Sequence, residues 1–73
     1  MFTLEKLGKH IKYYREKQNL SYYTLEKLSG ISKEYLIKIE KGKAKRIKVS
    51  QIKNLCDCFK ITLFDFICEV ENE

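Results

Sequence analysis

The sequence contains no proline, only three glycines and no long run of apolar residues. Proline is a strong helix breaker, so its absence suits a chain that is helical throughout. The longest apolar patches, residues 61–64 and 66–68, are far shorter than the roughly 20 residues that a helix needs to span a bilayer. The first residues carry closely spaced lysines and no apolar segment typical of a signal peptide. We therefore expect a cytoplasmic protein without a membrane segment.

Histidine and cysteine are too scarce to suggest a metal centre. The one histidine, His10, is far in sequence from the three cysteines, Cys56, Cys58 and Cys68. On a helix, Cys56 and Cys58 would point about 200° apart, and a reducing compartment disfavours disulfides. The chain also has no paired nucleophile and base and no glycine-rich phosphate loop. We expect no metal, no cofactor and no enzymatic activity.

Acidic residues are scarce in the middle of the chain, although they are frequent at its end. Residues 33–48 hold seven basic and two acidic side chains, whereas residues 57–73 hold one basic and five acidic side chains. The whole chain carries a net charge of +5. Such a distribution favours binding of a polyanion at one end of the molecule and disfavours it at the other.

Apolar residues recur at helical spacing along almost the whole chain. With 73 residues the chain has room for a single domain, residues 1–73, and we predict an all-α fold, a compact five-helix bundle. Thr3 is placed to cap a first helix over about residues 4–17, which Asn19 ends. A later helix is expected around residues 49–59, where the 3–4–3 spacing of Val49, Ile52, Cys56 and Phe59 gives one apolar, inward face. Another is expected after Thr62, followed by an acidic C-terminal tail over about residues 69–73.

The stretch LEKLSGISKEYL, residues 25–36, interrupts one helical pattern and restarts another. Ser21 and Ser32 are placed to cap the two helices, and Gly30 can take the positive φ that a tight turn requires. Ile31 would fill the gap between the helices. Leu25 and Leu28 are expected to face the core, and Leu25, Leu36 and Ile39 to hold the two helices together. The pattern indicates a helix-turn-helix over about residues 21–41.

With the flanking residues included, the sequence resembles the phage-repressor or Cro-type (xenobiotic-response-element type) helix-turn-helix family over about residues 4–68. The similar segments are LGKHIKYYREKQNLS, SYYTLEKLSGIS, KEYLIKIEKG and VSQIKNLCDCFKITLFDFI. The most specific is IEKG, residues 39–42, at its distance from Gly30. The resemblance implies a lambda-repressor-like fold and an ion pair between Arg15 and Glu40. It also implies a small bacterial or phage regulator that binds double-stranded DNA sequence-specifically. From its small size we expect a repressor, because a bare DNA-binding domain can block polymerase.

Two positions depart from the family pattern. Tyr22 stands where the family usually has a glutamine that reaches the phosphate backbone, although a tyrosine hydroxyl can also reach a phosphate oxygen. Glu26 stands where a small residue is usual, so that either its side chain turns outward or the two helices are slightly splayed.

The N-terminal residues of the second helix of the motif would enter the major groove. Lys33, Glu34 and Lys38 can bond to base edges there, and Tyr35 can pack against a thymine methyl; the alternative is an ordinary solvated helix face. The following loop, GKAKRIKV, carries the basic residues Lys43, Lys45, Arg46 and Lys48. We expect these residues to contact phosphates, the alternative being a charge run that only aids solubility.

Phe64 and Cys68 lie on one face of the last predicted helix, apart from the face that the bundle can bury. We expect this strip to join two copies into a homodimer on a palindromic operator, unless the C-terminus of the bundle covers it. A different interpretation is a protein-interaction module, such as an antitoxin-like component with a protein partner. The basic residues 33–48 argue for DNA, because a pure protein binder needs no such charge; a double role is compatible with both.

Overall fold

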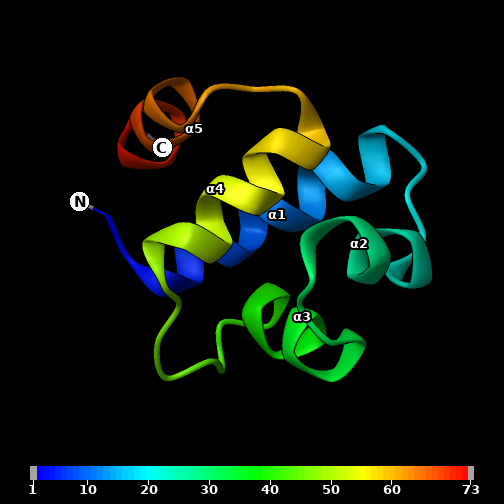
Figure 1. The fold of residues 1–73 in the computed structure, drawn as a ribbon. Coiled ribbons are helices and arrows are strands. Elements are labelled where there is room, and N and C mark those ends of the chain that lie inside the picture. Colours follow the sequence, from blue (N-terminus) through cyan, green and yellow to red (C-terminus); the bar gives the residue numbers. More distant parts are fainter. Residues whose placement is uncertain (1, 73) are drawn as a thin grey trace.

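Five helices follow one another along the chain in the computed structural model, which describes residues 2–72 (Figure 1). They are α1 (Leu4–Lys17), α2 (Tyr22–Ser29), α3 (Lys33–Glu40), α4 (Val49–Phe59) and α5 (Leu63–Glu71). No strand is present within residues 2–72, and no helix there is long and apolar enough to cross a membrane. The predicted all-α, five-helix fold is confirmed.

Short-range side-chain contacts determine where most of the helices begin. Four of the five start after a serine or threonine whose side-chain oxygen accepts the backbone N–H three residues later: Thr3, Ser21, Ser32 and Thr62. Each such cap stabilises its helix by about 1 kcal/mol. At the other ends, Asn19 after α1 has φ 54° and Gly30 after α2 has φ 77°, so the chain reverses at both positions.

The helices enclose one core, to which all five contribute. α1 packs against α3, α4 and α5, while α2 packs against α3 and α4. The fully buried side chains include Leu7, Ile11, Leu25, Leu36, Leu55, Cys56, Phe66 and Val70. In Figure 1, α5 lies beside α4 at one end of the bundle, and α3 lies at the opposite end.

Three predictions about individual segments are wrong. Leu28 was expected to face the core but is 60% exposed, because the short helix α2 buries only the stripe that contains Leu25. Val49 is 68% exposed, since it is the first residue of α4 and lies at the edge of the bundle. Residues 69–71 belong to the last turn of α5, where Val70 is buried, so they do not form an acidic tail; residue 73 of that predicted tail lies outside the described residues.

Gly8 lets α1 and α3 approach each other more closely than any side chain would permit. It is buried within α1, and a Cβ atom at this position would lie 2.0 Å from the backbone oxygen of Ile39. An isolated glycine inside a helical pattern often has such a packing reason. The contact fixes the separation of α1 from the C-terminal turn of α3.

Candidate nucleic-acid interface

The helix-turn-helix is formed by α2, a short turn and α3. The N–H of Gly30 donates to the carbonyl of Glu26 at 2.9 Å, and the N–H of Ile31 donates to Ser29 Oγ at 3.2 Å. Ile31 is 3% exposed and belongs to the core cluster between the helices, as the sequence predicts. Glu26 is half-buried on α2. The turn therefore holds α3 in a fixed position beside α2.

The outward face of α3 is polar and charged. Lys33, Glu34 and Lys38 are exposed, whereas Leu36 and Ile39 on the opposite face belong to the core. Three of the four side chains that the sequence assigns to base reading thus share one accessible face. Their chemistry offers hydrogen-bond donors from the lysines and an acceptor from the glutamate.

Residues 41–48, which we call the basic loop, follow α3 directly. The side chains of Lys43, Lys45, Arg46 and Lys48 are all exposed. Ala44 is buried and Ile47 is half-buried; together with Leu4, Leu7, Ile39 and Gly42 they line a small apolar niche. The loop therefore presents its cations to solvent while its apolar residues anchor it to the bundle.

Tyr35 connects α3 to the basic loop. Its ring is half-buried against the core cluster, and its hydroxyl donates a hydrogen bond to the carbonyl oxygen of Arg46. The sequence suggests a base contact for this side chain, but gives no sign of the loop contact. That contact joins a side chain to a backbone atom 11 residues away, and no local pattern encodes such a pairing.

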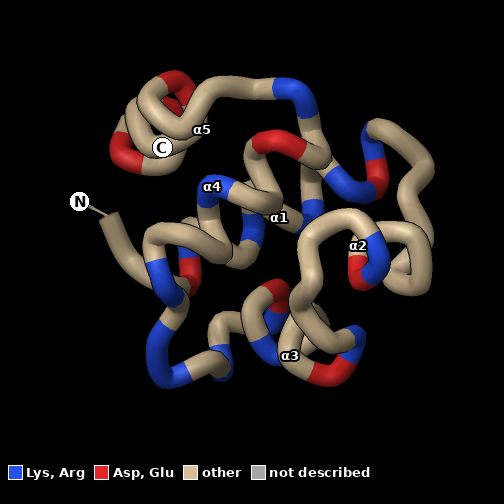
Figure 2. Tube along the Cα trace, viewed as in Figure 1, with Lys and Arg blue, Asp and Glu red and all other residues tan. Residues whose placement is uncertain are grey.

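Charges of opposite sign gather at opposite ends of the molecule. Figure 2 shows Lys and Arg positions along α3 and the basic loop, and Asp and Glu positions on α5. The acidic side chains of α5 are Asp65, Glu69 and Glu71. A polyanion is therefore attracted to the side formed by α3 and the basic loop, and repelled from α5.

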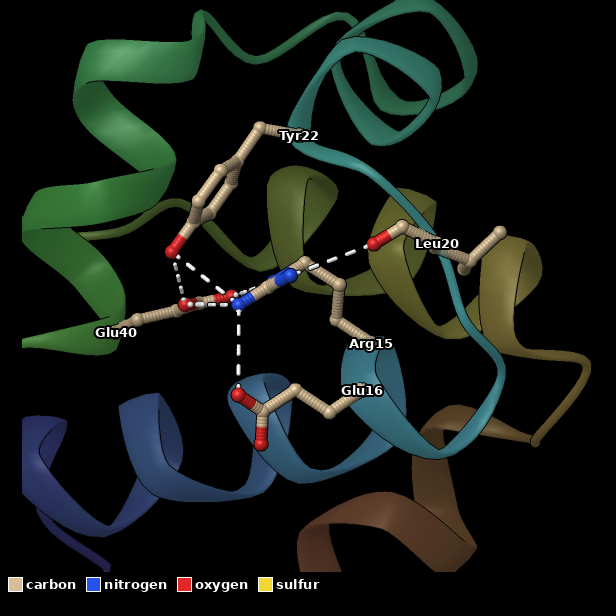
Figure 3. A network of polar contacts seen from close by, with 5 residues as sticks. All are labelled: Arg15, Glu16, Leu20, Tyr22 and Glu40. Carbon is tan, nitrogen blue, oxygen red and sulfur yellow. Dashed lines mark hydrogen bonds and ion pairs between the residues drawn. The ribbon is translucent and has the colours of Figure 1, made fainter.

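A polar network ties α1, α2 and α3 together behind this face (Figure 3). Arg15 Nε donates to Glu40 Oε2 at 2.7 Å, and Arg15 Nη2 donates to Glu40 Oε1 at 3.2 Å. The side chains are 13% and 3% exposed, respectively. Arg15 also donates to the carbonyl of Leu20 at 3.3 Å. The ion pair that the family resemblance implies is thus present, and it is bidentate and largely removed from solvent. The hydrogen bond with Glu40 raises the pKa of Arg15.

Tyr22 belongs to the same network, which revises its predicted role. Its hydroxyl donates to Glu40 Oε1 at 2.7 Å, and the guanidinium of Arg15 lies 4.1 Å from its ring centroid. A phenol has one proton, and phosphate oxygens only accept hydrogen bonds. Tyr22 therefore has no proton left for a phosphate in this geometry. Burial, together with the hydrogen bond to Glu40, raises the pKa of Tyr22, so the hydroxyl keeps that proton.

The cysteines are not arranged as metal ligands. Burial raises the pKa of the Cys56 thiol to about 11 and also raises that of Cys58. Within residues 2–72, His, Cys, Asp and Glu side chains form no group of three or more that could hold a metal ion.

An apolar side chain is exposed on α5, away from α3. Phe64 is 76% exposed, and Cys68, one turn later, is half-buried. The neighbouring Phe66 is fully buried, and Glu69 accepts a hydrogen bond from Tyr14 of α1. The helix is therefore held to the bundle by one face and leaves Phe64 in solvent.

The helix-turn-helix family model matches residues 11–66 of this chain. Among solved structures, the clp gene regulator ClgR from Corynebacterium glutamicum is similar with a TM-score of 0.85 and 22% identity, over 94% of this chain and 72% of that chain. The restriction-modification controller protein C.AhdI from Aeromonas hydrophila has a TM-score of 0.79 and 27% identity, over 86% of this chain and 94% of that one.

One curated relative is much longer than this chain. It is the glutamine–fructose-6-phosphate aminotransferase of Methanocaldococcus jannaschii, 33% identical over 63 residues, or 86% of this chain. The chain spans 6% of that relative's length, so the likeness concerns one small segment of that protein.

Proposed function

Because this chain belongs to the Cro/C1-type helix-turn-helix family, we propose that it reads a specific double-stranded DNA sequence with α3 in the major groove. Family membership makes it a DNA-binding transcriptional regulator and not an enzyme. One structural observation supports the finer proposal: α3 and the basic loop, with their Lys and Arg positions, lie at the same end of the molecule (Figure 2).

The proposed base contacts come from the exposed face of α3. Lys33 and Lys38 can donate to guanine O6 and N7, and Glu34 can accept from cytosine N4. All three are exposed on a helix whose opposite face is fixed in the core. A rigid helix suits this role, since base recognition depends on side chains held at defined positions.

The proposed phosphate contacts come from the basic loop: Lys43, Lys45, Arg46 and Lys48. Each neutralised phosphate releases condensed counterions, so that log K against log salt falls with a slope of about −0.9 per contact. Tyr22 is not included, because its proton is bonded to Glu40.

Neutralising two loop cations, with Lys45→Ala and Arg46→Ala, is expected to weaken binding to all duplexes alike. The salt slope should become shallower by about two units, because two phosphate contacts are lost. Fluorescence anisotropy with a labelled duplex at several salt concentrations measures this slope. The matched control is Lys9→Ala with Lys17→Ala, which removes the same charge from exposed positions on α1. Equal slopes for the two variants would contradict the phosphate role of the loop.

We assign the exposed strip with Phe64 and Cys68 to a two-fold contact between copies. The recognition helices of such dimers lie about 34 Å apart, one turn of DNA. The protein measures 30 × 25 × 21 Å, which is a suitable size for two copies side by side along one face of the duplex. A palindromic operator follows from the symmetry of the dimer.

Replacing Phe64 with glutamate is expected to give a monomer of 8.7 kDa where the unmodified protein sediments at twice that mass. The new carboxylate would be buried against an apolar surface in the dimer, which is strongly unfavourable. Analytical ultracentrifugation measures the mass. Leu28→Glu, at another exposed apolar position, is the control and should stay dimeric. A monomeric unmodified protein, or a dimeric Phe64→Glu, would rule out this contact.

Repression is the proposed regulatory mode, because a dimer bound over a promoter excludes polymerase. The cytoplasm is the proposed location, since the chromosomal DNA of a bacterium or the DNA of an infecting phage lies there.

A further inference from the structure

We propose that Tyr35 is a positioning residue that fixes the basic loop to α3, so that the base-reading and phosphate-binding side chains form one rigid unit. The proposal rests on the proposed function of α3 and the loop. It gives Tyr35 a role different from the base contact that its sequence position suggests.

The contact joins the beginning of α3 to the middle of the basic loop. Tyr35 lies in the first turn of α3, and its hydroxyl donates to the carbonyl oxygen of Arg46. The bond holds the backbone of Arg46 and leaves its side chain free, because only the carbonyl oxygen takes part. The cation of Arg46 thus extends from a fixed backbone position.

Other hydrogen bonds hold the two ends of the loop. At its start, the N–H of Gly42 donates to Ile39 and the N–H of Lys43 donates to Lys38, at 3.0 and 2.9 Å. At its end, the N–H of Lys48 donates to Gln51 Oε1 at 2.9 Å. Between these ends, the Tyr35 hydroxyl and the apolar niche with Ala44 and Ile47 are the contacts that hold the loop against the bundle.

Fixing the loop before DNA arrives reduces the entropy lost on binding. A mobile loop must be ordered when its cations meet phosphates, and that ordering weakens the complex. A loop bound to α3 is ordered already. It also places the phosphate contacts at a defined distance from the bases that α3 reads, which links affinity to the register of the helix on the duplex.

Tyr35→Phe tests this role, because it keeps the buried ring and removes only the hydroxyl. We expect binding of an operator duplex and of an unrelated duplex to fall by a similar factor of about five, the effect of one lost hydrogen bond. We also expect a shallower salt slope and faster amide hydrogen exchange in residues 44–47. A side chain that contacts bases directly would instead weaken the operator complex alone.

A double-mutant cycle separates positioning from a general loss of stability. In the Lys45→Ala, Arg46→Ala background, Tyr35→Phe should have almost no further effect, because the contacts that it positions are gone. The matched control is Tyr13→Phe, which removes the hydroxyl of an exposed tyrosine on α1 and should change neither affinity nor slope.

The outcomes distinguish this inference from the proposed function. If the unmodified protein binds duplexes with a steep salt slope but Tyr35→Phe acts additively with the loop variant, the positioning role is wrong while DNA binding stands. If the unmodified protein shows no salt-dependent binding of duplex DNA, the proposed function itself fails.

Discussion

Gly8→Ala is expected to destabilise the fold more than the same replacement at either of the other two glycines. The new Cβ would lie 2.0 Å from the backbone oxygen of Ile39, a separation at which α1 and α3 must move apart. Overpacking of a well-packed core costs about 3 kcal/mol, and more where backbone must shift. A domain of this size has a total stability of only about 5 kcal/mol. Urea unfolding followed by circular dichroism should show a large loss of stability, or an unfolded protein.

Gly30→Ala provides the matched control for Gly8→Ala. Gly30 has φ 77° but nothing within 4 Å of its virtual Cβ, so the alanine meets backbone strain and no clash. A left-handed conformation costs a non-glycine residue about 1–2 kcal/mol. If Gly8→Ala were as stable as Gly30→Ala, the close approach of α1 to α3 would be incorrect.

Glu40→Ala is the second change with a large expected effect. It leaves the charge of Arg15, in a side chain that is 13% exposed, and the hydroxyl of Tyr22 without their shared acceptor. Removing one partner of a buried ion pair typically costs about 3–5 kcal/mol, and the residual exposure of Arg15 places this case near the lower figure. The midpoint of thermal unfolding should fall by more than about 10 °C.

Two variants identify the cause of that loss. Asp57→Ala breaks the ion pair between Lys53 and Asp57, whose side chains are 63% and 64% exposed. This change should lower the stability of the fold by less than about 0.5 kcal/mol. Tyr22→Phe together with Glu40→Ala should be less damaging than the sum of the single changes, because both act on one network. A Glu40→Ala protein as stable as Asp57→Ala would show that the network does not hold α1 and α3 together.

The contacts at Gly8 and Arg15 act on the same element, the C-terminal half of α3. Gly8 lies against the backbone of Ile39, and Arg15 holds the side chain of the next residue, Glu40. One contact determines the distance between α1 and α3, and the other determines their register. A recognition helix fixed in this way presents its base-reading side chains without further rearrangement.

Local features of the fold could be predicted from the sequence because their causes lie within a few residues. Thr3, Ser21, Ser32 and Thr62 each bond to a backbone N–H three residues later, so a short window contains the whole interaction. Gly30 likewise marks the turn, because the turn needs a positive φ and glycine takes it without steric penalty.

The burial of single apolar residues was less predictable than the helices themselves. Periodicity places Leu28 and Val49 on the inward faces, but it cannot show that the short helix α2 and the first turn of α4 leave them uncovered. Phe64, by contrast, lies opposite the side of α5 that holds Phe66 and Val70 in the core, and is exposed as expected.

Contacts between distant segments could not be read from the sequence. The bond from Tyr35 to the Arg46 carbonyl and the approach of Gly8 to Ile39 depend on how helices meet in space. The ion pair of Arg15 with Glu40 was accessible only through the family resemblance, because 25 residues separate its partners. The same packing directs the Tyr22 hydroxyl to Glu40.

Selection of bound duplexes from a random-sequence DNA pool tests the central claim most directly. The unmodified protein and the Lys33→Ala, Lys38→Ala variant would be compared at near-physiological salt. The account predicts an enriched inverted repeat with half-sites about one helical turn apart, lost in the variant. Retention of DNA without any enriched sequence would contradict reading by α3 and leave only electrostatic binding, in favour of a protein-interaction module.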